Sequence, residues 1–126
     1  MDEFTLTNSE WYVLDCLWEH EPRTAMELVA ELGEKVGWAK STTLTTLRRM
    51  EEKGLVHVET VGRTRHYTPA VERQGAAARE TRSFLDKVYR GSVGLMVSAM
   101  AQDKALSKDE IDELYEILRK AEEGSK

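Results

Sequence analysis

The sequence contains a single cysteine, Cys16, which excludes an internal disulfide framework and any cysteine-rich metal site. It also lacks an apolar run near the ~18 residues that span a membrane, and it has no signal-peptide pattern. We therefore expect a soluble, cytoplasmic protein with no membrane insertion. Its 126 residues favour a single domain, or a compact domain with a helical appendage.

Catalytic and metal-binding motifs are missing as well. The sequence has no glycine-rich phosphate loop, no nucleophile motif and no paired acid/base arrangement. Its three histidines, His20, His57 and His66, do not have the spacing of metal ligands. A solvated helix face, and not a catalytic cluster, is expected for Asp109, Glu110, Asp112, Glu113 and Glu116. We expect no enzyme, no cofactor and no metal site.

Negative charge predominates, with a formal net charge of −5 at pH 7, but it is unevenly distributed. Residues 1–35 carry 2 basic and 9 acidic side chains, residues 36–68 carry 6 and 3, and residues 69–126 carry 10 and 11. Positive charge is therefore concentrated in the middle block. Because local potential decides docking on a polyanion, the negative total does not exclude a nucleic-acid partner.

The most informative segment, residues 38–54, lies in this middle block. Read as a helix at about 100° per residue, it places Leu44, Leu47 and Met50 on one face. The opposite face is predicted to consist of Thr42, Thr45, Thr46 and Arg49. Threonine is a poor helix former, so folding alone does not call for this face. Hydroxyls bind phosphates and base edges and arginine reads guanine, so we expect a DNA recognition helix.

The neighbours of this face have further predicted roles. Thr43 turns toward the apolar side and is expected to be packed. Ser41 is a candidate for the helix N-cap or for a phosphate contact, and Lys40 is a candidate for a phosphate contact at the same terminus. Arg48 lies on the flank, where a backbone phosphate and an internal salt bridge are equal alternatives.

Capping boxes predict where two helices begin before this segment. Residues 7–10, Thr-Asn-Ser-Glu, open a helix that runs to about residue 20, and residues 24–27, Thr-Ala-Met-Glu, open a second helix that ends at Gly33. Cys16 lies between core positions of the first helix and is expected to be a small buried hydrophobe, with redox sensing as the alternative. The predicted core faces consist of Trp11, Leu14, Trp18, Ala25, Leu28, Val29 and Leu32.

After residue 54 the period of the pattern changes from 3.6 to 2. Residues 56–60 alternate, residues 62–64 form a turn, and a second strand closes at Pro69. Three helices followed by a basic hairpin describe a winged helix-turn-helix over residues 1–70. Contacts with phosphate or the minor groove are predicted for Arg63, Arg65 and His66, although alternation places His66 on the face opposite Arg65.

Beyond residue 70 the chain is predicted to be helical and to form a dimerisation region, residues 71–126. A third capping box, residues 107–110, opens its last helix. Three short amphipathic helices enclose little core by themselves, so we expect their apolar faces to meet a second copy. The predicted interface consists of Phe84, Leu85, Val88, Tyr89, Leu95, Met96, Met100, Ile111, Leu114, Tyr115 and Leu118. The expected fold class is mostly α with a small β-hairpin wing (α+β).

Five segments in this order resemble the penicillinase repressor family, which includes regulators of β-lactamase and methicillin-resistance operons. Residues 6–18, with paired tryptophans, resemble the first helix of the family. Residues 41–55 resemble its recognition helix and residues 62–69 its wing. Two further segments, 84–91 and 106–114, resemble its dimerisation region.

The resemblance implies a homodimeric repressor on an inverted-repeat operator with TACA/TGTA-like dyads. It also implies release through a membrane sensor-protease system, with cleavage in the C-terminal helical part. The scissile bond of the family aligns near Ala99-Met100, where staphylococcal members have an Asn-Phe pair. The copper-responsive branch has a C-terminal cysteine cluster, which this sequence lacks.

Two alternatives stay open. The first is a winged-helix regulator that senses a small effector at its dimer interface. The second is a winged-helix protein-interaction module that binds another protein through its third helix. DNA binding would be distinguished by affinity that falls steeply as salt rises.

Overall fold

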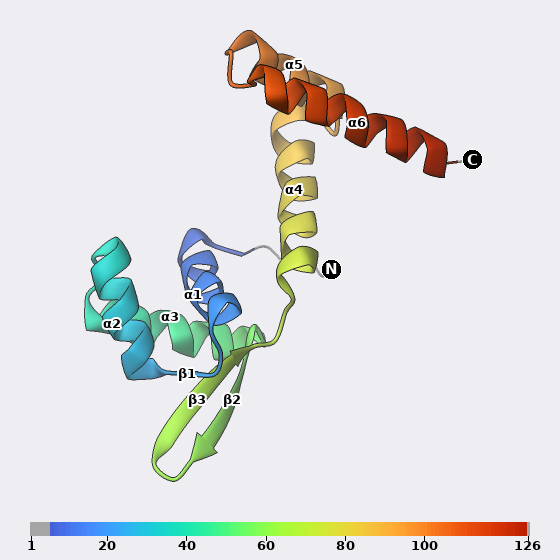
Figure 1. Ribbon diagram of the computed structural model, residues 1–126. Helices are drawn as coiled ribbons and strands as arrows, with labels where there is room; N and C mark the ends of the chain where they lie inside the picture. The colour runs from blue at the N-terminus through green and yellow to red at the C-terminus, as the bar shows by residue number, and fades with distance from the viewer. Residues whose placement is uncertain (1–5, 126) are drawn as a thin grey trace. The chain divides into compact units, whose positions relative to one another are not determined.

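The computed structural model describes residues 6–125, and the chain divides into two compact units, Met1–Thr81 and Arg82–Lys126. The first unit contains, in order, α1 (Asn8–Glu19), β1 (Arg23–Thr24), α2 (Ala25–Val36), α3 (Lys40–Lys53), β2 (Val56–Val61) and β3 (Thr64–Pro69). Helix α4 (Arg73–Tyr89) passes into the second unit, which continues with α5 (Val93–Gln102) and α6 (Lys108–Gly124) (Figure 1). The predicted winged helix-turn-helix, mostly α with a small sheet, is confirmed.

Reciprocal side-chain caps start three helices as predicted. At α1 the hydroxyl of Thr7 accepts from the Glu10 backbone N–H at 3.2 Å, and the Glu10 carboxylate accepts from the Thr7 backbone N–H at 2.9 Å. Helices α2 and α6 begin with the same exchange. Each box satisfies two backbone donors that the helix itself leaves open.

The predicted end of the second helix at Gly33 is wrong. Helix α2 continues to Val36 and ends at Gly37, whose φ of 73° lies in the left-handed region. Glycine is tolerated inside a helix at a modest cost, and the left-handed C-cap is the position that requires it. Here the tertiary packing of α2 overrides the local preference of Gly33.

The sheet has three strands rather than the two of the predicted hairpin. Strand β1 pairs antiparallel with β3, with Arg23 opposite Tyr67 and Thr24 opposite His66, so the strand order is β1-β3-β2. A strand of two residues is too short to show a period in the sequence. Its pairing places β3 in the centre of the sheet and attaches the hairpin to the start of α2.

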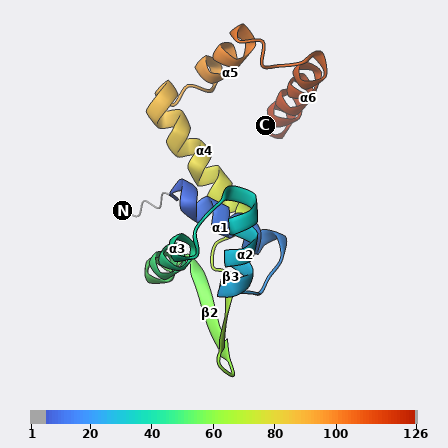
Figure 2. The same cartoon turned by 90° about the vertical axis from the view of Figure 1, so that its left-hand side faces the viewer.

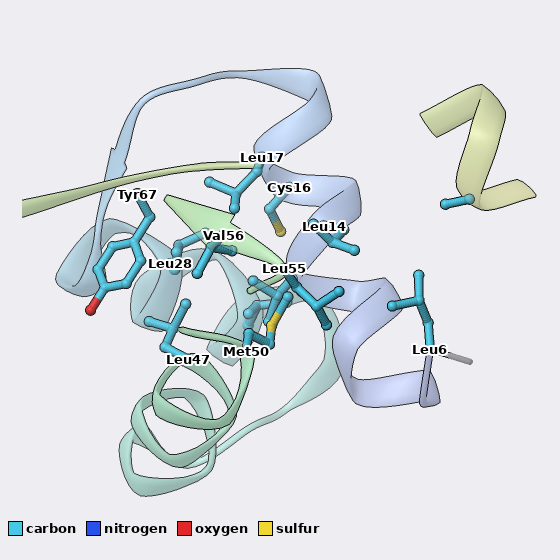
Figure 3. Packing of buried hydrophobic residues seen from close by; sticks show 13 residues of the cluster. Leu6, Leu14, Cys16, Leu17, Leu28, Leu47, Met50, Leu55, Val56 and Tyr67 are labelled. Atoms are coloured by element: carbon cyan, nitrogen blue, oxygen red, sulfur yellow. The ribbon is translucent and has the colours of Figure 1, made fainter. Parts of the chain in front are cut away.

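The core of the first unit lies between the three helices and the sheet. Figure 3 shows Leu14 and Leu17 of α1, Leu28 of α2, and Leu47 and Met50 of α3 gathered there, all of them fully buried. Burial of one such side chain contributes roughly 1.5–3 kcal/mol relative to exposure. Cys16 is also buried, as predicted for a small hydrophobe.

The first unit extends past residue 70 because the start of α4 packs onto it. Ala76 is buried, and the Trp18 indole donates to the Val71 carbonyl at 2.9 Å. The Arg73 guanidinium lies 5.0 Å from the Trp18 ring centroid and 3.2 Å from the Asp15 carboxylate. The compact units therefore divide inside α4 and not at the end of the sheet, where the sequence pattern changes.

The second unit leaves most of its apolar side chains exposed. Helices α5 and α6, all of whose residues the structure describes, contain no buried residue. Leu85 differs from the other predicted interface residues because it is only 4% exposed within its own chain. The exposed large apolar side chains of this unit are Phe84, Val88, Val93, Leu95, Met100, Ile111, Tyr115, Ile117 and Leu118. Within residues 6–125, none of the helices has the length and apolar character to cross a membrane.

Candidate nucleic-acid interface

The register of α3 decides which side chains face away from the core. The buried positions are Thr43, Thr46, Leu47 and Met50, which follow the i, i+3, i+4, i+7 spacing of one helix face. Leu44 is 37% exposed. The sequence-based prediction is therefore wrong for Leu44 and Thr46, which exchange sides. Leu44, Leu47 and Met50 are spaced by three, whereas a helix turn contains about 3.6 residues. Their positions therefore shift around the helix axis from one to the next, and they do not define its buried face.

The threonine hydroxyls of α3 consequently have different environments. The Thr46 hydroxyl donates to the Thr42 carbonyl at 2.8 Å, so it is used inside the helix and does not face a ligand. Thr43 is packed, as predicted, and its hydroxyl has no hydrogen-bond partner among the described residues. The hydroxyls left for recognition on this face belong to the exposed Ser41 and Thr42 and the half-buried Thr45.

The N-terminus of α3 lacks the side-chain cap that helices α1, α2, α5 and α6 have. The N-cap residue is Ala39, which offers no side-chain acceptor. The predicted N-cap role of Ser41 is wrong, because Ser41 lies inside the first turn of the helix. An uncapped helix N-terminus presents backbone N–H groups and a partial positive charge to an anion, and Lys40 adds a full positive charge there.

The basic side chains of this region fall into two groups, those that form an ion pair within the protein (held) and those that do not (free). Lys53 is held by the Glu10 carboxylate at 2.7 Å, and Arg65 is held by the Glu51 carboxylate at 2.8 Å. No ion pair within residues 6–125 involves Lys40, Arg48, Arg49 or Arg63, all of which are exposed. For Arg48, this geometry favours the phosphate alternative over the internal salt bridge. Four cations are thus available to a polyanion.

The hairpin of β2 and β3 extends beyond the helices in both views (Figures 1 and 2). Gly62, with a φ of 65°, and Arg63 form its two-residue turn, so Arg63 lies at the tip. Arg65 instead reaches back to α3. Its guanidinium also donates to the Tyr67 hydroxyl at 3.4 Å and lies 5.7 Å from that ring centroid. The Glu51 carboxylate accepts a hydrogen bond from the Arg65 guanidinium, which raises the pKa of Arg65 and links β3 to α3.

His66 is placed differently from the two arginines. It lies on the central strand, opposite Thr24 on one side and Glu59 on the other. Its Nδ1 atom is buried without a hydrogen-bond partner among the described residues. The structure therefore brings His66 toward β1 rather than together with Arg63 at the tip.

Two acidic residues form ion pairs at this surface that the sequence did not predict. Glu51 anchors the wing, and Glu10 both caps α1 and holds the last turn of α3 through Lys53. The partners are separated by 14 and 43 residues, so no local pattern connects them. The capping box indicated only the local role of Glu10.

Comparison with known proteins gives the same picture. A family model described as Penicillinase repressor matches residues 6–120. The chain is 31% identical over 113 residues to the penicillinase repressor of Bacillus licheniformis, which covers 90% of this chain and 88% of that protein. It is 26% identical over 117 residues to the methicillin resistance regulatory protein MecI of Staphylococcus aureus, covering 93% of this chain and 95% of that protein.

Among the solved structures similar to part of this chain is a relative bound to DNA. It is the solution structure of monomeric BlaI from Bacillus licheniformis in complex with the blaP half-operator. The similarity has a TM-score of 0.51 and 27% sequence identity, and it covers 56% of this chain and 87% of that chain.

Proposed function

Because the chain belongs to the penicillinase repressor family of DNA-binding, winged-helix transcription regulators, we propose that it represses transcription as a homodimer on an inverted-repeat operator. Its relatives are transcriptional repressors, and the chain is not an enzyme. The observation that carries the proposal is the outer face of α3. There, hydroxyls and free guanidinium groups lie beside an uncapped helix N-terminus.

The chemistry of this face assigns a role to each group. Helix α3 enters the major groove, where Thr42, Thr45 and Arg49 contact base edges. The N-terminus of α3 binds a phosphate through its backbone N–H groups, through Ser41 and through Lys40. Four free cations supply the salt-dependent part of the affinity: Lys40, Arg48, Arg49 and Arg63.

The exposed apolar side chains of the second unit support the proposed dimer. A helix such as α6, with Ile111, Tyr115 and Leu118 exposed, is stable when a second copy covers that face. Two copies then place two recognition helices on half-sites one or more turns of ~10 bp apart, with TACA/TGTA-like dyads. The complex of the relative BlaI with a half-operator supports one first unit per half-site.

Release of the operator is proposed to follow cleavage in the second unit, signalled by a membrane sensor-protease system. The bond between Ala99 and Met100 lies in the last turns of α5, and Met100 is 39% exposed. Cleavage there separates the DNA-binding unit from α6. A single first unit on one half-site loses the avidity of the pair.

The experiment that tests this proposal is selection of bound duplexes from a random library by the full-length protein at near-physiological salt. Enrichment of an inverted repeat, bound with two protein chains per duplex, is the expected result. Enrichment of single half-sites at one chain per duplex would contradict the dimer. Selection of no sequence would contradict operator recognition and favour a protein-interaction module.

A further inference from the structure

Helix α3 inverts the usual placement of polar and apolar side chains. Thr43 is 0% exposed and its hydroxyl has no partner among the described residues, while the adjacent Leu44 is 37% exposed. Burial of an unpaired hydroxyl opposes folding, and exposure of a leucine forgoes part of its burial energy. Single exposed leucines are common. This leucine, however, is next to Thr43, and the core would be expected to contain an apolar side chain in place of the Thr43 hydroxyl. The inversion therefore favours a role for Leu44 outside the core.

The surroundings of Leu44 indicate what that role is. Leu44 lies in the second turn of α3, three residues after Ser41 and four residues before Arg48, so all three share one side of the helix. Ser41 and Arg48 are exposed, and Arg48 makes no ion pair within residues 6–125. The apolar side chain is thus surrounded by groups suited to phosphates and base edges. In helix-turn-helix proteins, the N-terminal residues of the recognition helix are the ones that reach the bases.

The major groove offers one apolar group to such a side chain, the 5-methyl group of thymine. We infer that Leu44 reads the 5-methyl group of one thymine in each operator half-site. The contact hides the methyl group and part of the leucine from water, and it needs no hydrogen bond. It discriminates thymine from cytosine, which has no methyl group at this position. This inference rests on the proposed function, because it requires α3 to lie in the major groove.

Deoxyuridine provides a direct test, because it differs from thymidine only by the absence of this methyl group. In the duplex recovered by library selection, each thymine is replaced by uracil in turn, at equivalent positions of both half-sites. Affinities are measured for the wild-type protein and for Leu44→Ala. Met26→Ala is the matched control, because Met26 is an exposed apolar side chain (56%) that lies on α2 and not on α3.

We expect one replacement to weaken binding by wild type and Met26→Ala about fourfold per half-site, the equivalent of one buried methyl group. Leu44→Ala loses sensitivity at that thymine alone and keeps its sensitivity elsewhere. The inference would be overturned if wild type and Leu44→Ala lost equal affinity at every thymine. It would also be overturned if no uracil replacement changed the affinity of the wild type. Failure of the proposed function differs, because wild type would then prefer no sequence. Unchanged thermal unfolding of Leu44→Ala shows that the fold is retained.

Discussion

At the level of residues, the proposed nucleic-acid interface depends on which cations form no ion pair within the protein. Lys53 and Arg65 are held by carboxylates, whereas Arg49 is exposed with no ion pair among the described residues. We predict that Arg49→Ala weakens operator binding by roughly 1–3 kcal/mol and relaxes base preference at one position, as expected for a bidentate contact with guanine. Competition binding on operator and random duplexes measures both effects. Equal losses on the two duplexes would instead identify Arg49 as a phosphate contact.

The corrected register of α3 provides a second prediction at this scale, through a matched pair of variants. Thr45 is half-buried and lies on the outer side, while the Thr46 hydroxyl bonds the Thr42 carbonyl inside the helix. Thr45→Val should alter the base preference found by library selection, because it removes a hydroxyl from the interface. Thr46→Val should leave that preference unchanged and cost about 1 kcal/mol of stability at most. If Thr46→Val altered the base preference and Thr45→Val did not, Thr46 would face the DNA.

Cys16 gives a third prediction, on the pH dependence of stability. Burial raises the pKa of the Cys16 thiol above its ordinary value of 9.0. At lower pH the thiol is protonated in both states, and its contribution to stability is fully present. Above the ordinary pKa the unfolded chain loses this proton while the folded chain keeps it, so folding becomes less favourable. The difference in unfolding free energy between wild type and Cys16→Ala should therefore shrink between pH 8 and pH 10. A constant difference, measured by urea unfolding, would contradict this assignment.

At the level of elements, one ion pair connects the β2–β3 hairpin with α3, the proposed recognition helix. Arg65 of β3 forms an ion pair with Glu51 of α3, so its charge is partly used within the protein. We predict that Glu51→Gln frees Arg65 for a phosphate and steepens the dependence of log affinity on log salt by about 0.9. Glu52→Gln is the matched control, because it removes the same charge from the next position of α3. Equal salt slopes for the two variants would show that Arg65 stays off the DNA.

At the level of the whole molecule, the proposed repressor needs two copies of the chain, and the exposed face of α6 is where they are proposed to meet. Tyr115 is 71% exposed and Leu118 is 61% exposed, so neither supports the fold of the single chain. We predict that the double variant Tyr115→Glu, Leu118→Glu is monomeric in sedimentation equilibrium. It should lose at least tenfold in affinity for the full operator, because avidity is lost. Its affinity for an isolated half-site should match that of the wild type. A dimeric variant would place the interface elsewhere.

Much of this architecture could be predicted from short-range pattern. The capping boxes at Thr7, Thr24 and Ser107 were predicted correctly because a capping box is a contact between residues three apart. The change of period after residue 54 predicted the hairpin for the same reason, since a two-residue turn is a local structure. The concentration of cations in residues 36–68 predicted the surface that we propose for DNA, because charge is a property of composition.

The tertiary structure alone decided which face of α3 is buried, how the wing is braced, and where the first unit ends. Thr46 and Leu44 exchange sides because the packing of α3 against α1 and α2, and not its own pattern, selects the inward face. The two-residue β1 exists only because β3 lies beside it. Arg65 meets Glu51 across 14 residues of sequence, and Ala76 is buried by an element that precedes it in the chain. These contacts join residues that are distant in sequence, so no local propensity determines them.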